Sequence, residues 1–200
     1  MKNLLIVLSG PSGVGKGTIV NRLLSSGGFS LSVSYTTRAP REGESEGVSY
    51  FFTDKQTFEK RISEGGFLEY SEHFGNYYGT PKDFVYEKLK CGDVILEIEV
   101  DGALQVKRAH PEALLIMIAP PNEGELISRL EKRGSESREK IRERVKRMDY
   151  ELSKKNLYDY TVVNDDLEEA VERTASIMRA EHSRVSRGVQ DLIARYKEEV

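Results

Sequence analysis

Residues 10–18 read Gly10-Pro11-Ser12-Gly13-Val14-Gly15-Lys16-Gly17-Thr18 and follow the apolar run Leu4–Leu8. A segment with the spacing of a helix, Thr18–Leu24, comes next. In this order of strand, glycine-rich loop and helix, backbone N–H groups and the helix N-terminus point at a bound phosphate. The lysine of such a loop reaches the outer phosphates of a nucleotide. The stretch therefore predicts that the chain binds a nucleoside triphosphate, with Lys16 at its outer phosphates.

The loop departs from the usual pattern at one position. A serine or threonine normally follows the lysine and serves a magnesium ion, whereas this chain has Gly17 there. Thr18 supplies the nearest hydroxyl, and two roles are open to it: contact with a phosphate, or contact with Mg²⁺ through water. The competing interpretation is a glycine turn that only caps a helix. The strand before the loop and the helix after it favour the phosphate site.

The composition describes a globular chain without a dominant charge. Its 200 residues match one domain, and 33 acidic against 30 basic residues argue against a general nucleic-acid or membrane-surface binder. The single cysteine, Cys91, excludes an internal disulfide, and we expect it to pack at a helix end rather than act as a nucleophile. The first apolar run is too short for a secretory segment or a membrane span. We expect a cytoplasmic protein, with monomer or homo-oligomer left open.

Four short apolar runs have the character of buried parallel strands: Leu4–Leu8, Val94–Ile98, Leu114–Ala119 and Tyr160–Val163. Helical patterns alternate with them at Thr18–Leu24, Ala103–Ala109 and Leu167–Val185. This alternation predicts an α/β fold with a parallel sheet core flanked by helices. Ligands of such sheets bind at the carboxyl ends of the strands, so the loop 10–18, Glu97, Glu99 and Asn164-Asp165 are expected to cluster.

Two segments interrupt the alternation and predict a division of the chain. Residues 33–92 are rich in Tyr, Thr, Gly and charge, and predict an inserted α+β subdomain with helices at Lys55–Ser63 and Pro81–Leu89. Residues 123–155 predict a charged helical hairpin that turns near Gly134-Ser135. The core then comprises residues 1–32, 93–122 and 156–200, and its tail, Ser186–Val200, predicts a short amphipathic helix.

The insert contains the side chains of a small-molecule pocket. Arg38 and Arg41 lie three residues apart beside a proline and are suited to bracket a phosphate with bidentate, charge-assisted bonds. Tyr50 and Tyr78 add hydroxyl donors, and Glu69 and Thr80 are candidates for the edge of a base. The insert therefore predicts a second anionic ligand beside the triphosphate.

At this point the sequence strongly resembles the guanylate kinase family. Matching blocks run in order from Leu4 to about Arg184: Ser34-Tyr35-Thr36-Thr37-Arg38, Arg41-Glu42-Gly43-Glu44, Gly47 to Phe52, Glu69, Tyr78-Gly79-Thr80 and Asn164-Asp165. The resemblance implies a P-loop enzyme that converts ATP and GMP, and dGMP, to ADP and GDP or dGDP with Mg²⁺. It makes residues 33–92 a GMP-binding subdomain and residues 123–155 a lid.

Carried over by position, the resemblance assigns a role to each matching residue. By this resemblance, the GMP phosphate is bound by Ser34, Arg38, Arg41, Tyr50 and Tyr78. Guanine is bound by Glu69, Thr80 and Glu99. The resemblance implies that residues 10–18 bind ATP, with Asn164 and Asp165 beside its adenine. It implies that Thr18 and Glu97 bind Mg²⁺. The catalytic residues are Lys16, Arg133 and Arg144, with Arg129 and Arg138 as further lid candidates. Arg142 and Arg147 are expected on a solvated helix face, and His73, His110 and His182 in surface or loop roles.

One block departs from the family pattern. Many relatives carry Asp-Ile-Asp, one residue and Gln-Gly after the second core strand, whereas this chain reads Glu97-Ile98-Glu99-Val100-Asp101-Gly102. Glu97 is long enough to serve Mg²⁺ or its waters, and the competing interpretation of Glu97 and Glu99 is a solvated strand end. Asp101 replaces an amide with a charge and has no assigned role.

Two other functions fit parts of the pattern. An adenylate kinase also favours a Gly-Lys-Gly-Thr loop, but its acceptor pocket has less use for a carboxylate at Glu69. A non-catalytic guanylate-kinase-like domain binds phosphopeptides at the GMP site, but such domains tend to have degraded phosphate loops. Because Gly10, Gly15 and Lys16 are present, the sequence favours the kinase.

Overall fold

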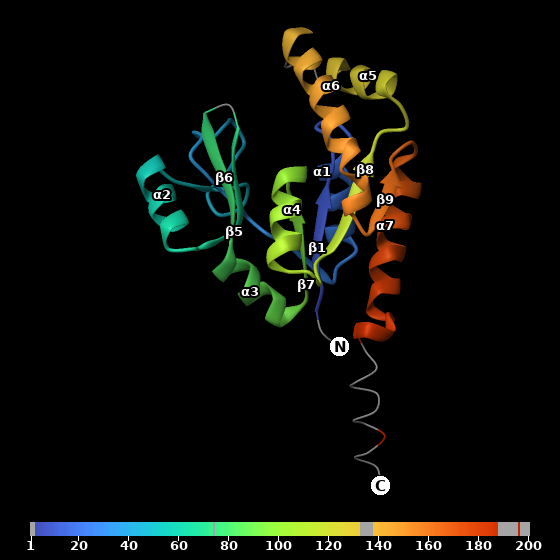
Figure 1. Cartoon of the computed structure of the whole chain (residues 1–200), viewed down its shortest axis with the longest axis horizontal. Helices are drawn as coiled ribbons and strands as arrows, with labels where there is room; N and C mark the ends of the chain where they lie inside the picture. Colours follow the sequence, from blue (N-terminus) through green and yellow to red (C-terminus); the bar gives the residue numbers. More distant parts are fainter. Residues whose placement is uncertain (1–2, 74, 133–137, 188–195, 197–200) are drawn as a thin grey trace.

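The structure is a computed structural model that describes the chain except residues 1–2, 74, 133–137, 188–195 and 197–200, and the side chains of 138–140. It contains two sheets and two long charged helices above the first of them (Figure 1). No described helix is long and apolar enough to cross a membrane.

The first sheet is parallel, with strand order β2-β7-β1-β8-β9. Its strands are β1 (Leu5–Ser9), β2 (Phe29–Leu31), β7 (Asp93–Glu97), β8 (Leu114–Ala119) and β9 (Tyr160–Val163). The α/β class and the four predicted parallel strands are confirmed, but β9 is an edge strand that buries only Val162, so its predicted burial was wrong. The fifth strand, β2, was not predicted because its sequence, Phe-Ser-Leu, is only three residues long and half-buried at the sheet edge.

Helices bury both faces of this sheet, as its continuous apolar strands require. Successive side chains of β1 alternate between the faces, so Ile6 and Leu8 pack in one cluster and Leu5 and Val7 in the other. The helices α1 (Lys16–Ser25) and α7 (Leu167–His182) cover the first face, and α3 (Lys82–Cys91) and α4 (Val100–Ala109) cover the second. Dispersion and apolar burial hold both layers.

The second sheet is mixed, with strand order β4-β3-β6-β5. Its strands are β3 (Tyr35–Thr36), β4 (Phe51–Phe52), β5 (Phe67–His73) and β6 (Asn76–Pro81), and α2 (Lys55–Ser63) starts at Asp54, which accepts a capping bond from the Thr57 N–H. The helix α4 packs against β5, which joins the two sheets (Figure 1). The sequence patterns identified α2 but not the β5–β6 hairpin, because polar side chains interrupt its alternation.

Two charged helices, α5 (Glu123–Lys132) and α6 (Arg138–Ser153), pack against each other above the phosphate loop, followed by a 3-10 turn at Lys155–Leu157. Leu126, Leu130 and Met148 anchor this pair in the core cluster beside Val14. The predicted turn near Gly134-Ser135 and most of the predicted tail helix lie outside the described residues.

The predicted helix bounds and the expectation for Cys91 differ in part from the structure. The helix α4 begins at Val100 rather than Ala103, because Glu99 already takes the N-cap conformation. The helix α7 ends at His182 rather than Val185. Cys91 is the last residue of α3, which confirms the predicted helix end, but it is exposed, so the expected packing role was wrong.

Candidate active site

The phosphate loop bends tightly between β1 and α1, and only glycine fits its turns. Gly10 has a φ of 140°, and a Cβ there would lie 2.1 Å from the carbonyl oxygen of Ile118 in β8. Gly15 has a φ of 93°, and its Cβ would lie 2.6 Å from Nδ2 of Asn164. The Lys16 ammonium donates to the carbonyl oxygens of Gly10 at 2.6 Å and Pro11 at 3.1 Å. The lysine therefore lies across its own loop.

Asn164, directly after β9, contacts the phosphate loop through its side-chain amide. Its side chain is buried, and Nδ2 donates to the carbonyl oxygen of Val14 at 2.7 Å. Its own carbonyl accepts from Nη1 of Arg129 on α5 at 3.0 Å. The next residue, Asp165, is exposed. The resemblance had suggested that Asn164 and Asp165 lie beside the adenine of ATP. The contact of the Asn164 amide with the loop is structural, and no local sequence pattern predicts it.

A carboxylate lies beside the start of α1, where the metal is expected. The parallel register pairs Leu8 with Glu97, so the end of β7 lies next to the phosphate loop. A Cβ on Gly17 would be 3.4 Å from Oε1 of Glu97, so this carboxylate lies close to the first turn of α1. Thr18 is exposed in the first turn of α1. Among the described residues, no three His, Cys, Asp or Glu side chains form a metal cluster.

The second sheet presents an ordered guanidinium at its edge. Nη2 of Arg38 donates to Oε1 of Glu44 at 2.8 Å, and its guanidinium lies 5.5 Å from the centre of the Tyr50 ring. The other oxygen of Glu44 accepts from the backbone N–H of Arg41, and these bonds, from Arg38 first, lower the pKa of Glu44. The rings of Tyr50 and Tyr78 meet edge-on with centres 6.0 Å apart.

The remaining predicted residues of this edge differ in exposure. Arg41 is exposed, whereas Ser34, directly before β3, is half-buried. The Nε of Arg38 is buried and has no hydrogen-bond partner among the described residues. A buried donor of this kind favours an added acceptor such as a phosphate oxygen.

A buried carboxylate lies between the β5–β6 hairpin and α4. Antiparallel pairing places Glu69 of β5 opposite Thr80 of β6, and the Thr80 hydroxyl donates to Oε1 at 2.6 Å. Burial raises the pKa of Glu69 to about 7, and the charge of Glu99 adds to this shift. A Cβ on Gly102 of α4 would lie 2.6 Å from Oε2 of Glu69. Gly102 therefore lets α4 approach the Glu69 carboxylate. The sequence around Asp101 and Gly102 did not predict this role.

Among the described side chains of the two charged helices, Arg144 contacts the phosphate loop. Nη1 of Arg144 on α6 donates to the hydroxyl of Ser12. Arg133 and the side chain of Arg138 lie outside the described residues. Arg129 pairs with Glu125 at 2.9 Å as well as with Asn164.

The expectation of a solvated surface fails for Arg147 and holds for Arg142. Arg147 is half-buried and donates to Glu99 and Glu151 at 2.6 and 3.0 Å. His73, expected on the surface, has a largely buried side chain with Nε2 3.1 Å from Glu99. A charge run on a helix cannot indicate which of its members face another element, and this is why the pattern misassigned Arg147.

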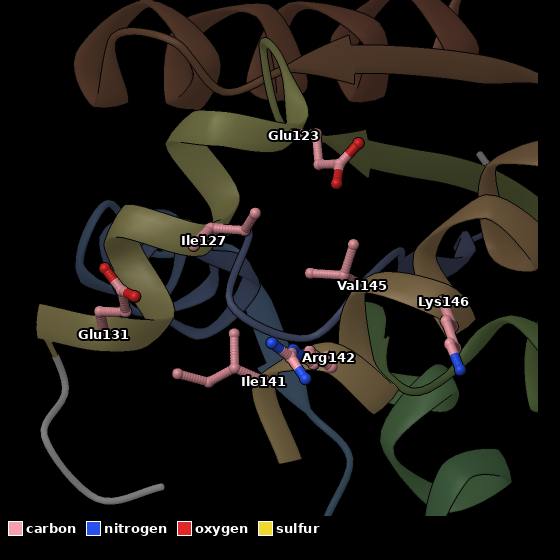
Figure 2. Close-up of a pocket in the computed structure, with 7 residues that line it drawn as sticks. All are labelled: Glu123, Ile127, Glu131, Ile141, Arg142, Val145 and Lys146. Atoms are coloured by element: carbon pink, nitrogen blue, oxygen red, sulfur yellow. The ribbon is translucent and has the colours of Figure 1, made fainter. Parts of the chain in front are cut away.

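Arg142 borders a separate hollow of about 430 Å³ between α5 and α6 (Figure 2). The hollow has an apolar floor and charged rims, formed by Glu123, Ile127, Glu131, Ile141, Arg142, Val145 and Lys146. Arg142 is exposed, on the side of α6 away from Arg144 and Arg147. This hollow lies apart from the residues predicted to bind nucleotides.

Fold and site together define a class. A parallel sheet with a phosphate loop at its carboxyl edge, a lysine across that loop, and a facing sheet with an ordered arginine and a buried carboxylate are features of a P-loop kinase. The guanylate kinase family model matches residues 2–181. The chain therefore belongs to the guanylate kinase family, and it is a nucleotide-binding kinase.

Individual relatives agree over nearly the whole length. The guanylate kinase of Clostridium tetani is 51% identical over 198 residues, covering 98% of this chain and 95% of that protein. That of Listeria innocua is 47% identical over 199 residues, covering 98% and 95%. The crystal structure of guanylate kinase from Anaplasma phagocytophilum superposes with a TM-score of 0.78 at 35% identity, covering 96% and 93%.

Proposed function

We propose that the protein transfers the γ-phosphoryl group of ATP to GMP, giving ADP and GDP. The observation that carries this proposal is the buried Glu69 carboxylate held by Thr80. Guanine presents N1–H and N2–H₂ donors on one edge, and a carboxylate accepts from both. Adenine has no donor at N1 and would leave a buried acceptor unpaired, which costs binding free energy.

The acceptor phosphate is proposed to lie against Arg38, Arg41 and the two tyrosine hydroxyls, with Ser34 beside them. Arg38 is pre-ordered by Glu44, so little side-chain entropy is lost when a phosphate binds. All of these proposed acceptor contacts are with the phosphate or the base, and we propose dGMP as a second acceptor. The acceptor is already a phosphate oxygen, so no general base is required.

Phosphoryl transfer depends on positioning and on stabilising charge. Lys16 is proposed to turn from its loop carbonyls to the outer phosphates of ATP, and Arg144 and Arg133 to stabilise the transferring group. Closure of α5 and α6 would exclude water from that group. The contact between Arg144 and Ser12 supports this, because it places an α6 guanidinium at the phosphate loop.

The residues present fit a magnesium ion bound with ATP. Glu97 offers hard oxygen ligands beside α1 and Thr18 a hydroxyl, which suits an ion that keeps several waters and phosphate oxygens in its shell. When bound with ATP beside Glu97 and Thr18, the ion would supply positive charge that offsets the charge developing on the transferring group.

A coupled assay of ADP release with GMP, dGMP, AMP and UMP tests the proposal. We expect turnover with GMP and dGMP and at least about 100-fold lower kcat/KM with AMP. A preference for AMP would assign the chain to an adenylate-kinase-like activity. Absence of turnover with every acceptor, with phosphopeptide binding at the same edge, would assign a non-catalytic role.

Replacing Arg38 by alanine should weaken GMP more than ATP. The variant removes charge-assisted bonds to the acceptor phosphate, so we expect the Kd for GMP to rise by roughly 10- to 100-fold and that for ATP by less than about twofold. Titration calorimetry measures both. The control is Arg22→Ala, whose guanidinium forms an exposed pair with Glu168. Equal weakening of both nucleotides would remove Arg38 from the acceptor site.

Replacing Gly102 by alanine should damage the acceptor site without unfolding the helix. The new methyl group would displace the Glu69 carboxylate from its position in the acceptor site, and we expect a roughly tenfold higher KM for GMP, equivalent to about 1.4 kcal/mol of lost binding free energy. Alanine favours helix formation, so the melting temperature should change little. The control is Gly124→Ala on α5, where the nearest atom to a Cβ is 3.4 Å away. An unchanged KM would show that Glu69 moves aside freely.

A further inference from the structure

A cluster of charged side chains joins α6 to the acceptor site. Nη2 of Arg147 donates to Oε2 of Glu99 at 2.6 Å, and Nη1 lies 3.3 Å from Nδ1 of His73 in β5. Nη2 also lies 3.7 Å from Asp101, whose other oxygen accepts from the Tyr150 hydroxyl at 2.8 Å. One guanidinium therefore contacts the start of α4 and the end of β5 from a third element.

The position of the Glu99 carboxylate is set by this cluster rather than by its own helix. Glu99 is the N-cap residue of α4, yet its side chain makes no capping bond. Both of its contacts, with Arg147 and with His73, use Oε2. Oε1 makes no hydrogen bond with the described residues. The carboxylate is thus held by one oxygen, with the second oxygen available to a ligand.

Arg147 is itself held in place. Its Nε donates to Oε1 of Glu151, one turn further along α6 and buried. Burial raises the pKa of Glu151, whereas the bond from Arg147 favours its charged form. The guanidinium also lies among Glu99, Asp101 and Glu151, where it offsets their mutual repulsion. A fixed cation at this point fixes the carboxylate that it binds.

We propose that Arg147 is a positioning residue for purine recognition: it orients Glu99 so that Oε1 receives the 2-amino group of guanine. This inference rests on the proposed function, which supplies the guanine ligand. It places part of the selectivity on α6, outside the GMP-binding subdomain. Arg147 acts through Glu99 and touches no nucleotide itself.

Inosine monophosphate, which is GMP without the 2-amino group, separates this role from a structural one. We expect Arg147→Met to raise the Kd for GMP by roughly tenfold, the equivalent of one misplaced charge-assisted hydrogen bond, and to leave the Kd for IMP within about twofold. Titration calorimetry on the full chain measures both. Arg142→Met is the matched control on the opposite side of the same helix, and should change neither. Arg147→Lys should restore part of the GMP affinity.

A double-mutant cycle with Glu99→Gln shows whether Arg147 acts through Glu99. In the Glu99→Gln background, adding Arg147→Met should produce no further loss of GMP affinity. Equal weakening of GMP and IMP by Arg147→Met, or additive losses in the cycle, would overturn the proposal and assign Arg147 to general stability. Failure of the unmodified chain to bind GMP would instead reject the proposed function, so the two failures are distinguishable.

Discussion

Replacing Lys16 by alanine is expected to lower kcat by about a thousandfold, the scale observed when one pre-organised charge-stabilising donor is lost. The lysine extends across the phosphate loop and is proposed to meet the outer phosphates of ATP. In the structure its ammonium bonds to the carbonyl oxygens of Gly10 and Pro11. Because these bonds are within a single loop, their loss should lower the free energy of unfolding by no more than about 2 kcal/mol.

Steady-state kinetics with ATP and GMP, together with urea unfolding without nucleotide, measure the two effects of Lys16→Ala separately. Lys55→Ala is the control, since Lys55 lies on the exposed face of α2 and forms a 3.8 Å pair with Glu59 and a cation–π contact with Tyr77. Retained turnover would remove Lys16 from catalysis. Unfolding of the variant under native conditions would show that the lysine is mainly a structural support of its loop.

Replacing Glu69 by glutamine should stabilise the fold at pH 8 and still abolish tight GMP binding. Burial raises the pKa of Glu69 from an ordinary 4.5 to about 7. The folded state therefore disfavours the charged carboxylate, and its contribution to stability is fully present below pH 4.5 and is lost as the pH rises to about 7. The difference between the two pKa values corresponds to a loss of up to about 3 kcal/mol of unfolding free energy above pH 7.

The glutamine side chain keeps an oxygen for the Thr80 hydroxyl and carries no charge, so the pH-dependent loss disappears. Its amide places a donor against the guanine donors, and we expect the Kd for GMP to rise by roughly a thousandfold or more. Urea unfolding at pH 5 and pH 8 and GMP titration test both effects. Glu72→Gln, at an exposed position of the same strand, is the control. A variant less stable than the parent chain at pH 8 would contradict the buried, raised-pKa carboxylate.

Short-range patterns were sufficient for the central sheet and the phosphate loop. The strands β1, β7 and β8 are apolar runs because helices cover both of their faces, and such runs are visible in the sequence alone, whereas the edge strand β9 buries only Val162. The glycines at 10 and 15 are visible for a similar reason, since positive φ values and close backbone approach restrict these positions to glycine. The edge strand β2 was not predicted, because three half-buried residues are too few to show an alternating apolar pattern.

Side chains whose role depends on a distant partner could not be assigned in this way. Asn164 lies far along the chain from Val14, and its amide contact exists only because β9 ends beside the loop. Gly102 is required by the approach of α4 to β5, which no local pattern records. Arg147 differs from Arg142 only in the side of α6 that it occupies, and in the sequence both are members of one charged run.

The amino-acid sequence by itself determined the α/β class, the phosphate loop and the list of polar side chains suited to two nucleotides, because these depend on local periodicity and on residue chemistry. Only the tertiary structure decided that Glu69 is buried with a raised pKa and that Arg147 holds Glu99. Burial, desolvation and ion pairing arise from elements that are distant in the chain and packed together in space, so their effects become readable only after the fold has brought those elements into contact.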